Sequence, residues 1–224
     1  TRKESSAASD VYKRQEKHFG SYEAKGKRTG MTKPDFHHEK MTRKKETEQA
    51  HLCLGFNGLE AGHPEIYDLI VLNNILGGSM SSRLFQDVRE DKGLAYSVFS
   101  YHTSYEDSGM MTIYAGTGAN QLQLLSETIH ETLRVLKSDG ITPKELENSK
   151  EQMKGSLMLS LESTNSKMSR NGKNELLLGK HRTLDEIIEK LNAVSLERVN
   201  NLANRIFTDD YSSALISPSG ELPK

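Results

Sequence analysis

An arginine and a tyrosine seven residues apart, Arg89 and Tyr96, are the side chains whose chemistry is most informative in this chain. A guanidinium group and a phenolic hydroxyl both donate hydrogen bonds. Two such donors aimed at one carbonyl oxygen can stabilise negative charge that develops on it. The spacing lets Arg89 and Tyr96 converge on one substrate carbonyl. The alternative is a solvated arginine on a helix face and a tyrosine half-buried in a sheet.

A helix, a turn and a strand are predicted to position this pair. Ser81 or Ser82 is a suitable N-cap, and Gly93 is suited to a left-handed residue after a helix that ends near Lys92. Alternating residues from 94 to 101 predict a strand with two faces. One face would hold Leu94, Tyr96 and Val98, and the other Ala95, Ser97 and Phe99. Arg89 would lie about 6 Å along the helix before the turn, and Tyr96 about 10 Å along the strand after it. The tips of both side chains can therefore reach the same end of the predicted helix–sheet layer.

Length and composition are those of an ordinary globular protein. The chain has 224 residues, of which 34% are hydrophobic and 27% charged, and its formal net charge is −1. No apolar run is long enough to span a membrane. Residues 1–45 are rich in lysine and arginine but lack a nucleic-acid recognition motif, so we expect no nucleic-acid partner. The single cysteine, Cys53, excludes an internal disulfide and favours a reducing compartment, which we expect to be a bacterial cytoplasm.

The N-terminal region divides into two predicted segments. Residues 1–15 are polar and have no periodic apolar pattern. Because residues 10–15 resemble the translated end of a sequencing adapter, we expect residues 1–15 to be foreign and disordered. Residues 16–45 are predicted to contain the end of a helix capped by Gly20, followed by a linker rich in lysine and glycine.

One cluster of potential metal ligands lies in this linker, at His37, His38 and Glu39. Zinc sites need three or four convergent ligands on an ordered element, and catalytic sites on a helix space their histidines one turn apart. This cluster lacks that spacing. We therefore expect no metal site and no cofactor site within this chain.

Residues 46–218 are predicted to form one domain, and residues 219–224 a short tail. Alternation predicts strands at residues 49–56, 94–101 and 110–116, the last two as an antiparallel pair. Residues 65–76 are apolar around most of a helix circumference, which predicts a buried helix that ends at Gly77. Start signals at Asn120, Thr142, Thr183 and Ser195 predict further helices.

The end of the chain completes the predicted fold. A returning strand is expected from Tyr211 to Ile216, and breaks in the helical region at Gly155 and Gly172. The methionines of this region are interpreted as core fillers: Met153, Met158 and Met168. Strands followed by helices and a returning strand predict an α+β fold with helices packed on one face of a mainly antiparallel sheet.

Two runs resemble a known family. They are Gly77–Phe85, which reads Gly-Gly-Ser-Met-Ser-Ser-Arg-Leu-Phe, and Gly93–Ser97, which reads Gly-Leu-Ala-Tyr-Ser. With Arg89 between them, they resemble the C-terminal domain of the pitrilysin/insulinase family of zinc peptidases, which includes the mitochondrial processing peptidases. The resemblance covers residues 46–218 and implies a two-layer roll, duplicated within the complete protein. It places zinc in the first copy, whose His-x-x-Glu-His motif is not in this chain. It also implies that the helix end at residues 16–20 is the remnant of that first domain's last helix.

The resemblance implies that this chain is the C-terminal, substrate-binding domain of a zinc-dependent metalloendopeptidase acting on peptides or unfolded segments. Arg89 and Tyr96 would be catalytic residues that reach into the active site, and the missing N-terminal half would bind the zinc. This fragment alone would be inactive. Its partners would be the peptide substrate, its own N-terminal domain and a second subunit in a homo- or heterodimer. The alternative is a non-catalytic homologue or partner subunit with a structural or substrate-presenting role.

Overall fold

The computed structural model describes residues 2–23 and 32–223, which belong to two separate compact units, Thr1–Thr32 and Lys33–Lys224. The first unit contains helix α1 (Arg2–Phe19), which ends where the Gly20 amide donates to the Glu16 carbonyl at 2.8 Å. The helix end at Gly20 agrees with the prediction, whereas the disorder expected for residues 1–15 was wrong for residues 2–15. Alanine, lysine, glutamate and glutamine are good helix formers, which favours a local helix without a core. Residues 10–23 are all exposed.

The second unit is built on a five-stranded sheet in the order β1-β5-β2-β4-β3. The strands are β1 (Lys40–Lys44), β2 (Gln49–Asn57), β3 (Ala95–Ser104), β4 (Gly109–Gly118) and β5 (Ser212–Ser217). β1 and β5 are parallel, and the other neighbouring pairs are antiparallel. The mainly antiparallel sheet confirms the predicted fold class. The linker expected up to residue 45 is wrong at its end, because β1 already pairs with β5; its five exposed side chains gave no apolar alternation.

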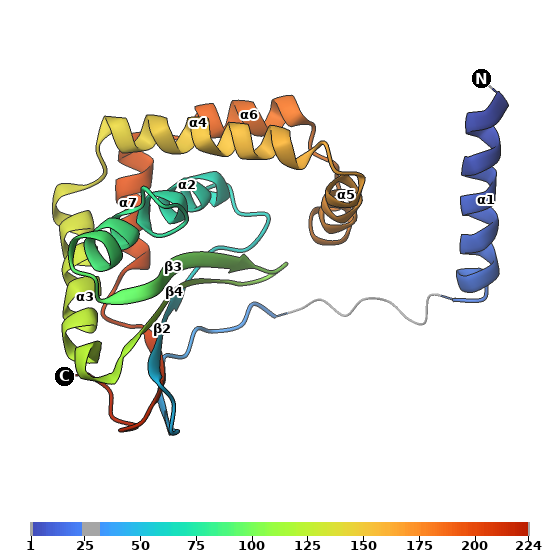
Figure 1. The fold of residues 1–224 in the computed structure, drawn as a ribbon. Helices are drawn as coiled ribbons and strands as arrows, with labels where there is room; N and C mark the ends of the chain where they lie inside the picture. Colours follow the sequence, from blue (N-terminus) through green and yellow to red (C-terminus); the bar gives the residue numbers. More distant parts are fainter. Residues whose placement is uncertain (1, 24–31, 224) are drawn as a thin grey trace. The chain divides into compact units, whose positions relative to one another are not determined.

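The helices gather on one side of this sheet (Figure 1). They are α2 (Ile66–Leu76), α3 (Leu122–Asp139), α4 (Pro143–Ser160), α5 (Thr164–Leu178), α6 (Leu184–Asn192) and α7 (Leu196–Ile206), with a 3-10 turn, η2 (Ala119–Gln121), before α3. The predicted alternation of β2 is confirmed, since its apolar side chains are at most 2% exposed: Ala50, Leu52, Leu54 and Phe56. These residues and the apolar faces of α2, α3 and α7 form the core.

Helices begin at the predicted N-caps with two exceptions. Neither Ser81 nor Ser82 caps the helical turn that carries Arg89, where the Ser82 hydroxyl instead donates to the Ser79 carbonyl at 2.6 Å. Capping boxes are present at Thr142 and Thr183, and the Ser195 hydroxyl caps α7. Asn120 caps nothing, because it lies within η2 and α3 begins at Leu122.

The helical half differs from the prediction in its breaks and its methionines. The helical region is interrupted between Ser160 and Thr164, and not at the two predicted glycines. Gly155 and Gly172 lie inside α4 and α5, where a Cβ built on either glycine would have no atom within 4 Å. Met153 packs partly against the core, but Met158 and Met168 are 54% and 65% exposed, so their assignment as core fillers was wrong. Their part of α4 and α5 has no buried residue to pack on.

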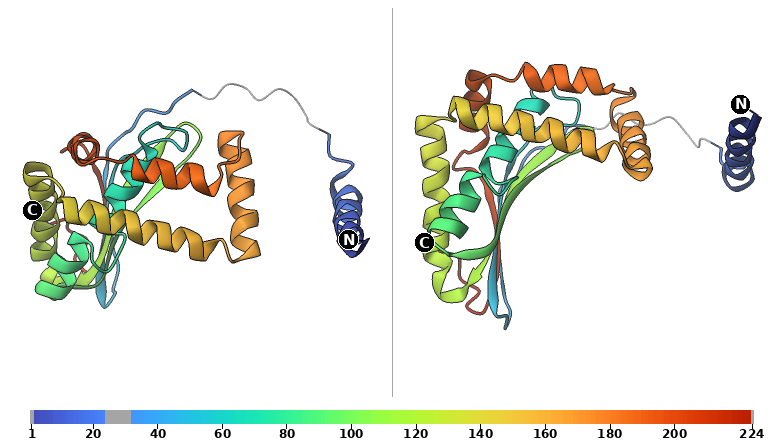
Figure 2. Two further views of the ribbon diagram at one scale, coloured as in Figure 1. Left: turned by 90° about the horizontal axis from the view of Figure 1, so that it is seen from above. Right: turned by 45° about the horizontal axis from the view of Figure 1, so that its top comes forward.

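α4 and α6 lie side by side (Figure 2). Lys150 on α4 is 8% exposed, and its amine donates to the carbonyls of Asn192 at 3.0 Å and Val194 at 2.6 Å. A cation therefore satisfies the carbonyls at the C-terminal end of α6. None of the helices that the structure describes has both the length and the apolar character needed to cross a bilayer.

Candidate functional site

Arg89 lies on η1 (Phe85–Asp91), which is a π-helical turn and not the α-helix that the sequence predicted. The turn closes where the Leu94 amide donates to the Val88 carbonyl at 2.8 Å. Gly93 has a φ of 59°, so its predicted left-handed conformation is confirmed. π-helical turns are rare and are often found at functional sites.

Tyr96 lies at a β-bulge near the start of β3. Ala95 pairs with Thr117 and Ser97 with Gly116, so Tyr96 is an extra residue in the ladder. Bulges redirect side chains at sheet edges and active sites. The prediction that Tyr96 shares a face with Val98 was therefore wrong: Val98 is 5% exposed and Tyr96 is 76% exposed.

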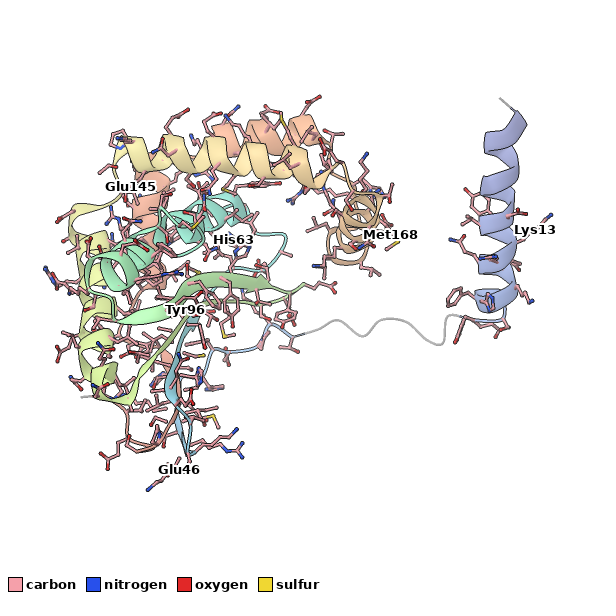
Figure 3. All side chains as sticks on the ribbon, in the orientation of Figure 1. Lys13, Glu46, His63, Tyr96, Glu145 and Met168 are labelled. Atoms are coloured by element: carbon pink, nitrogen blue, oxygen red, sulfur yellow. The ribbon has the colours of Figure 1, made fainter. Side chains whose placement is uncertain are left out.

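The two predicted residues meet (Figure 3 labels Tyr96). The Arg89 guanidinium carbon lies 4.7 Å from the centre of the Tyr96 ring and 4.8 Å from that of Phe85, which are cation–π distances. The Arg89 side chain is 35% exposed, and its Nε is 3.8 Å from the Glu90 carboxylate. Arg89 is therefore partly enclosed by the rings of Phe85 and Tyr96.

The pair offers two kinds of donor on one small surface. Within the described part of the chain, no residue hydrogen-bonds to the Tyr96 hydroxyl, which is free to meet a ligand. The cation–π contacts use the faces of the rings and leave the N–H groups at the edge of the guanidinium plane available. An oxygen carrying partial negative charge is the group that such a surface binds best.

Arg83 anchors the chain just before η1. Its guanidinium donates to both carboxylate oxygens of Glu145, at 2.7 and 2.9 Å, and to the Gly140 carbonyl at 2.7 Å. Glu145, at the start of α4 (Figure 3), also accepts from the Thr142 amide at 2.7 Å within the capping box. Burial opposes ionisation of Glu145, but the hydrogen bonds from Arg83 and Thr142 outweigh it and hold its pKa below the usual value.

Two further hydrogen bonds tie η1 to α3. The Thr132 hydroxyl donates to the Asp87 carboxylate at 2.6 Å, and the Lys92 amine donates to the Thr128 hydroxyl at 3.0 Å. Beyond the turn, the buried Thr117 hydroxyl donates to the Leu94 carbonyl at 2.6 Å. The backbone on both sides of the pair is thereby fixed to α3, α4 and β4, which pre-orients the two tips.

The positioning role of Arg83 was missed by the sequence analysis, although Arg83 is part of the run that carries the family resemblance. Its partner Glu145 lies 62 residues further on, and no periodic pattern joins two such distant positions. The sequence did hold one signal for this contact, the predicted capping box at the start of α4. A glutamate in a capping box can accept further hydrogen bonds after the one from the N-cap amide, so Glu145 could be expected to bind an arginine.

The described residues contain no group of three or more His, Cys, Asp or Glu side chains that could hold a metal ion. His37, His38 and Glu39 are all exposed. The described residues therefore do not fit a zinc site.

Residues 8–153 match the family model described as "Peptidase M16 inactive domain". The chain is 83% identical over 208 residues to "Uncharacterized zinc protease YmxG" of Bacillus subtilis, a match that covers 93% of this chain and 51% of that protein. It is 37% identical over 175 residues to "Uncharacterized zinc protease ML0855" of Mycobacterium leprae, covering 78% and 39%. The chain thus spans about half the length of these relatives or less.

Two solved structures share the fold. A protease from Helicobacter pylori superposes with a TM-score of 0.79 at 21% identity, over 94% of this chain and 52% of that one. A peptidase M16 inactive domain from Pseudomonas fluorescens superposes with a TM-score of 0.74 at 22% identity, over 84% and 45%. The sheet with helices on one face is thus the architecture of these two proteins as well.

Proposed function

The chain belongs to the peptidase M16 (pitrilysin/insulinase) family as its C-terminal, inactive-type domain, and from this premise we propose that it supplies Arg89 and Tyr96 to the active site of a zinc-dependent endopeptidase. The observation that carries the proposal is their contact: the guanidinium lies 4.7 Å from a phenol ring whose hydroxyl has no partner among the described residues. The substrate class is peptides or unfolded segments.

In this proposal the two side chains act on the scissile carbonyl of the bound peptide. The Tyr96 hydroxyl donates one hydrogen bond to the carbonyl oxygen and the Arg89 guanidinium donates a second. Both bonds strengthen as that oxygen gains negative charge, so they stabilise the transition state more than the substrate. The stacking of Arg89 on Phe85 and Tyr96 limits its rotamers before substrate binds, which reduces the entropy lost on binding.

The remaining chemistry would come from outside this chain. Relatives about twice as long are named zinc proteases, which supports zinc and an attacking water in the other half of the complete protein. We further propose that this chain pairs with that half, and that a homo- or heterodimer is the working unit.

The test is turnover by the complete protein, in which this chain is joined to its upstream half. Arg89→Ala and Tyr96→Phe are each expected to lower kcat by about 10²- to 10³-fold, the usual loss when one such donor is removed. Zinc content, measured by elemental analysis, should not change. Tyr105→Phe is the matched control, since Tyr105 is a 58% exposed tyrosine in the β3–β4 connection. Unchanged kcat in both site variants, with intact zinc and fold, would refute the proposal.

A second function, that of a non-catalytic partner subunit, is favoured by one observation. α4 and α5 expose four large apolar side chains: Met158, Leu159, Met168 and Leu176. Exposed apolar side chains gathered in one region mark protein–protein contacts. A complete protein that forms a stable dimer but has no peptidase activity at any zinc concentration would support this second function over the first.

A further inference from the structure

The helix-free face of the sheet has small residues at its centre and large ones around them. Strand register aligns Tyr101, Thr112, Gly55 and Ser212 in one row across β3, β4, β2 and β5. The next row aligns Phe99, Tyr114, Cys53, Ala214 and Met41 across all five strands. Residues directly opposite one another point to the same face. The small side chains of β2 and β5, together with Thr112 of β4, therefore leave a depression between the larger side chains on β1, β3 and β4.

A cavity of about 400 Å³ occupies this depression. Its principal walls are Met41, Cys53, Gly55, Tyr101, Met110 and Thr112. Gly55 keeps one wall open, since a Cβ there would lie 3.4 Å from the Met110 sulfur. A volume of this order is at the lower end of that of ligand pockets, and it accommodates a large apolar side chain together with its adjoining backbone atoms.

Thr112 provides an independent indication of a ligand. It lines the cavity and is 4% exposed, and its hydroxyl has no hydrogen-bond partner among the described residues. A buried hydroxyl without a partner is costly and needs an explanation. Met110, which also lines the cavity, has a flexible side chain that can adapt to a ligand. A ligand that reaches Thr112 would therefore satisfy a polar atom that the folded chain leaves unpaired.

The cavity also lies at a defined distance from the Arg89–Tyr96 pair. Tyr101, in its wall, follows Tyr96 by five residues on β3. A strand advances about 3.4 Å per residue, so the two positions are about 17 Å apart. An extended peptide has nearly the same rise. A peptide that places its scissile carbonyl at the pair and follows β3 therefore brings a residue about five positions away to the cavity.

We propose that this cavity is a substrate subsite that receives an apolar side chain of an extended peptide, about five residues from the scissile bond. The proposal rests on the function proposed above for Arg89 and Tyr96. Met41, Met110 and Tyr101 supply apolar surface to the side chain, and the Thr112 hydroxyl bonds to a backbone amide or carbonyl of the same residue. The subsite selects substrates by affinity and takes no part in bond cleavage.

Cys53 permits a direct test in the 224-residue chain, because it is the single cysteine and it lines the cavity. Burial raises the pKa of its thiol, so its reaction with a thiol reagent is followed near pH 9. A ten-residue peptide with one phenylalanine should slow the modification of Cys53 by about threefold or more at saturation, as expected when most sites are occupied. The same peptide with aspartate in place of phenylalanine should not. Equal rates with and without the phenylalanine peptide would overturn the proposal.

Thr112→Val separates a ligand-binding hydroxyl from a structural one. The variant keeps the shape and removes the unpaired hydroxyl, so the melting temperature should be unchanged or higher while the phenylalanine peptide protects Cys53 less well. Equal protection in the variant would overturn the role of Thr112. If toluene protects Cys53 as well as the peptide does, the cavity is a site for small apolar molecules and the peptide subsite is refuted.

The complete protein distinguishes this inference from the function on which it rests. Thr112→Val should raise KM several-fold, at unchanged kcat, for peptides with phenylalanine about five residues from the scissile bond on one side. Tyr96→Phe should lower kcat. If Thr112→Val leaves KM unchanged while Tyr96→Phe lowers kcat, the subsite is refuted. If Thr112→Val raises KM while Tyr96→Phe leaves kcat unchanged, the catalytic pair is refuted and the cavity remains a peptide-binding site.

Discussion

Arg83→Ala is expected to destabilise the 224-residue chain strongly, because one substitution removes three hydrogen bonds. The Arg83 side chain is 17% exposed, and its bonds to Glu145 and Gly140 measure 2.7 to 2.9 Å. Bonds to a charged group contribute about 1.5–3 kcal/mol each, and because these share one guanidinium we expect a combined loss of about 3 kcal/mol. At about 2–4 °C per kcal/mol for a domain of this size, the melting temperature should fall by about 6–12 °C.

The assay is thermal and urea unfolding followed by circular dichroism, with Arg134→Ala as the matched control. Arg134 also makes a bidentate contact with a glutamate, Glu131. Both of these side chains are more than half exposed, so the pair should contribute little to the free energy of unfolding. A loss below about 1 kcal/mol for Arg83→Ala, or a loss no larger than that of the control, would refute the positioning role.

The pH dependence of the same variant gives a second readout. Since the folded state holds the pKa of Glu145 below its usual value of 4.5, the Glu145 interactions contribute stability above that value. This contribution is lost as the pH falls below 4.5 and through the lowered value of the folded state. Arg83→Ala removes part of the pKa depression, so the variant should lose less stability than the parent chain over this acid range. An identical acid loss in both proteins would show that Arg83 does not hold the Glu145 carboxylate.

Three further changes are expected to act on stability, each measured by urea or thermal unfolding. Lys150→Met should cost about 1–3 kcal/mol, because it leaves the carbonyls of Asn192 and Val194 unpaired, and an unchanged midpoint would contradict this. Gly93→Ala should cost about 1–2 kcal/mol, because alanine is disfavoured at a φ of 59°, whereas a gain in stability would contradict the left-handed turn. Deleting residues 1–15 should leave the midpoint unchanged within error, as expected for a foreign segment, and a lower midpoint would show that it packs on the domain.

Local patterns in the sequence predicted much of the fold. Residues 49–56 alternate between apolar and polar, which predicts β2, because a strand buried on one face needs apolar residues at every second position. Residues 65–76 are apolar around most of the helix, which predicts α2, because a helix buried on most sides needs apolar residues on most sides. The capping boxes at Thr142 and Thr183 fix helix starts through hydrogen bonds within four residues. Such features depend only on near neighbours, and the sequence therefore specifies them reliably.

Features that depend on distant partners could not be predicted in this way. The bulge at Tyr96 is a shift in the register of β3 against β4, and it places the Tyr96 side chain outside the buried face of the sheet. The bidentate contact of Arg83 with Glu145 and the pairing of β1 with β5 join segments 62 and more than 150 residues apart. The Arg89–Tyr96 contact was within reach of sequence reasoning because a single turn at Gly93 separates the two residues.

A double-mutant cycle on Arg89 and Tyr96 in the complete protein tests the central claim most directly. If both donors serve the same developing charge, Arg89→Ala and Tyr96→Phe should each lower kcat/KM by about 10²- to 10³-fold, and the double variant should lose much less than the product of the two factors. Zinc content and melting temperature should stay close to those of the parent. A double variant whose loss equals the product of the single losses, or single variants with full activity, would contradict the account.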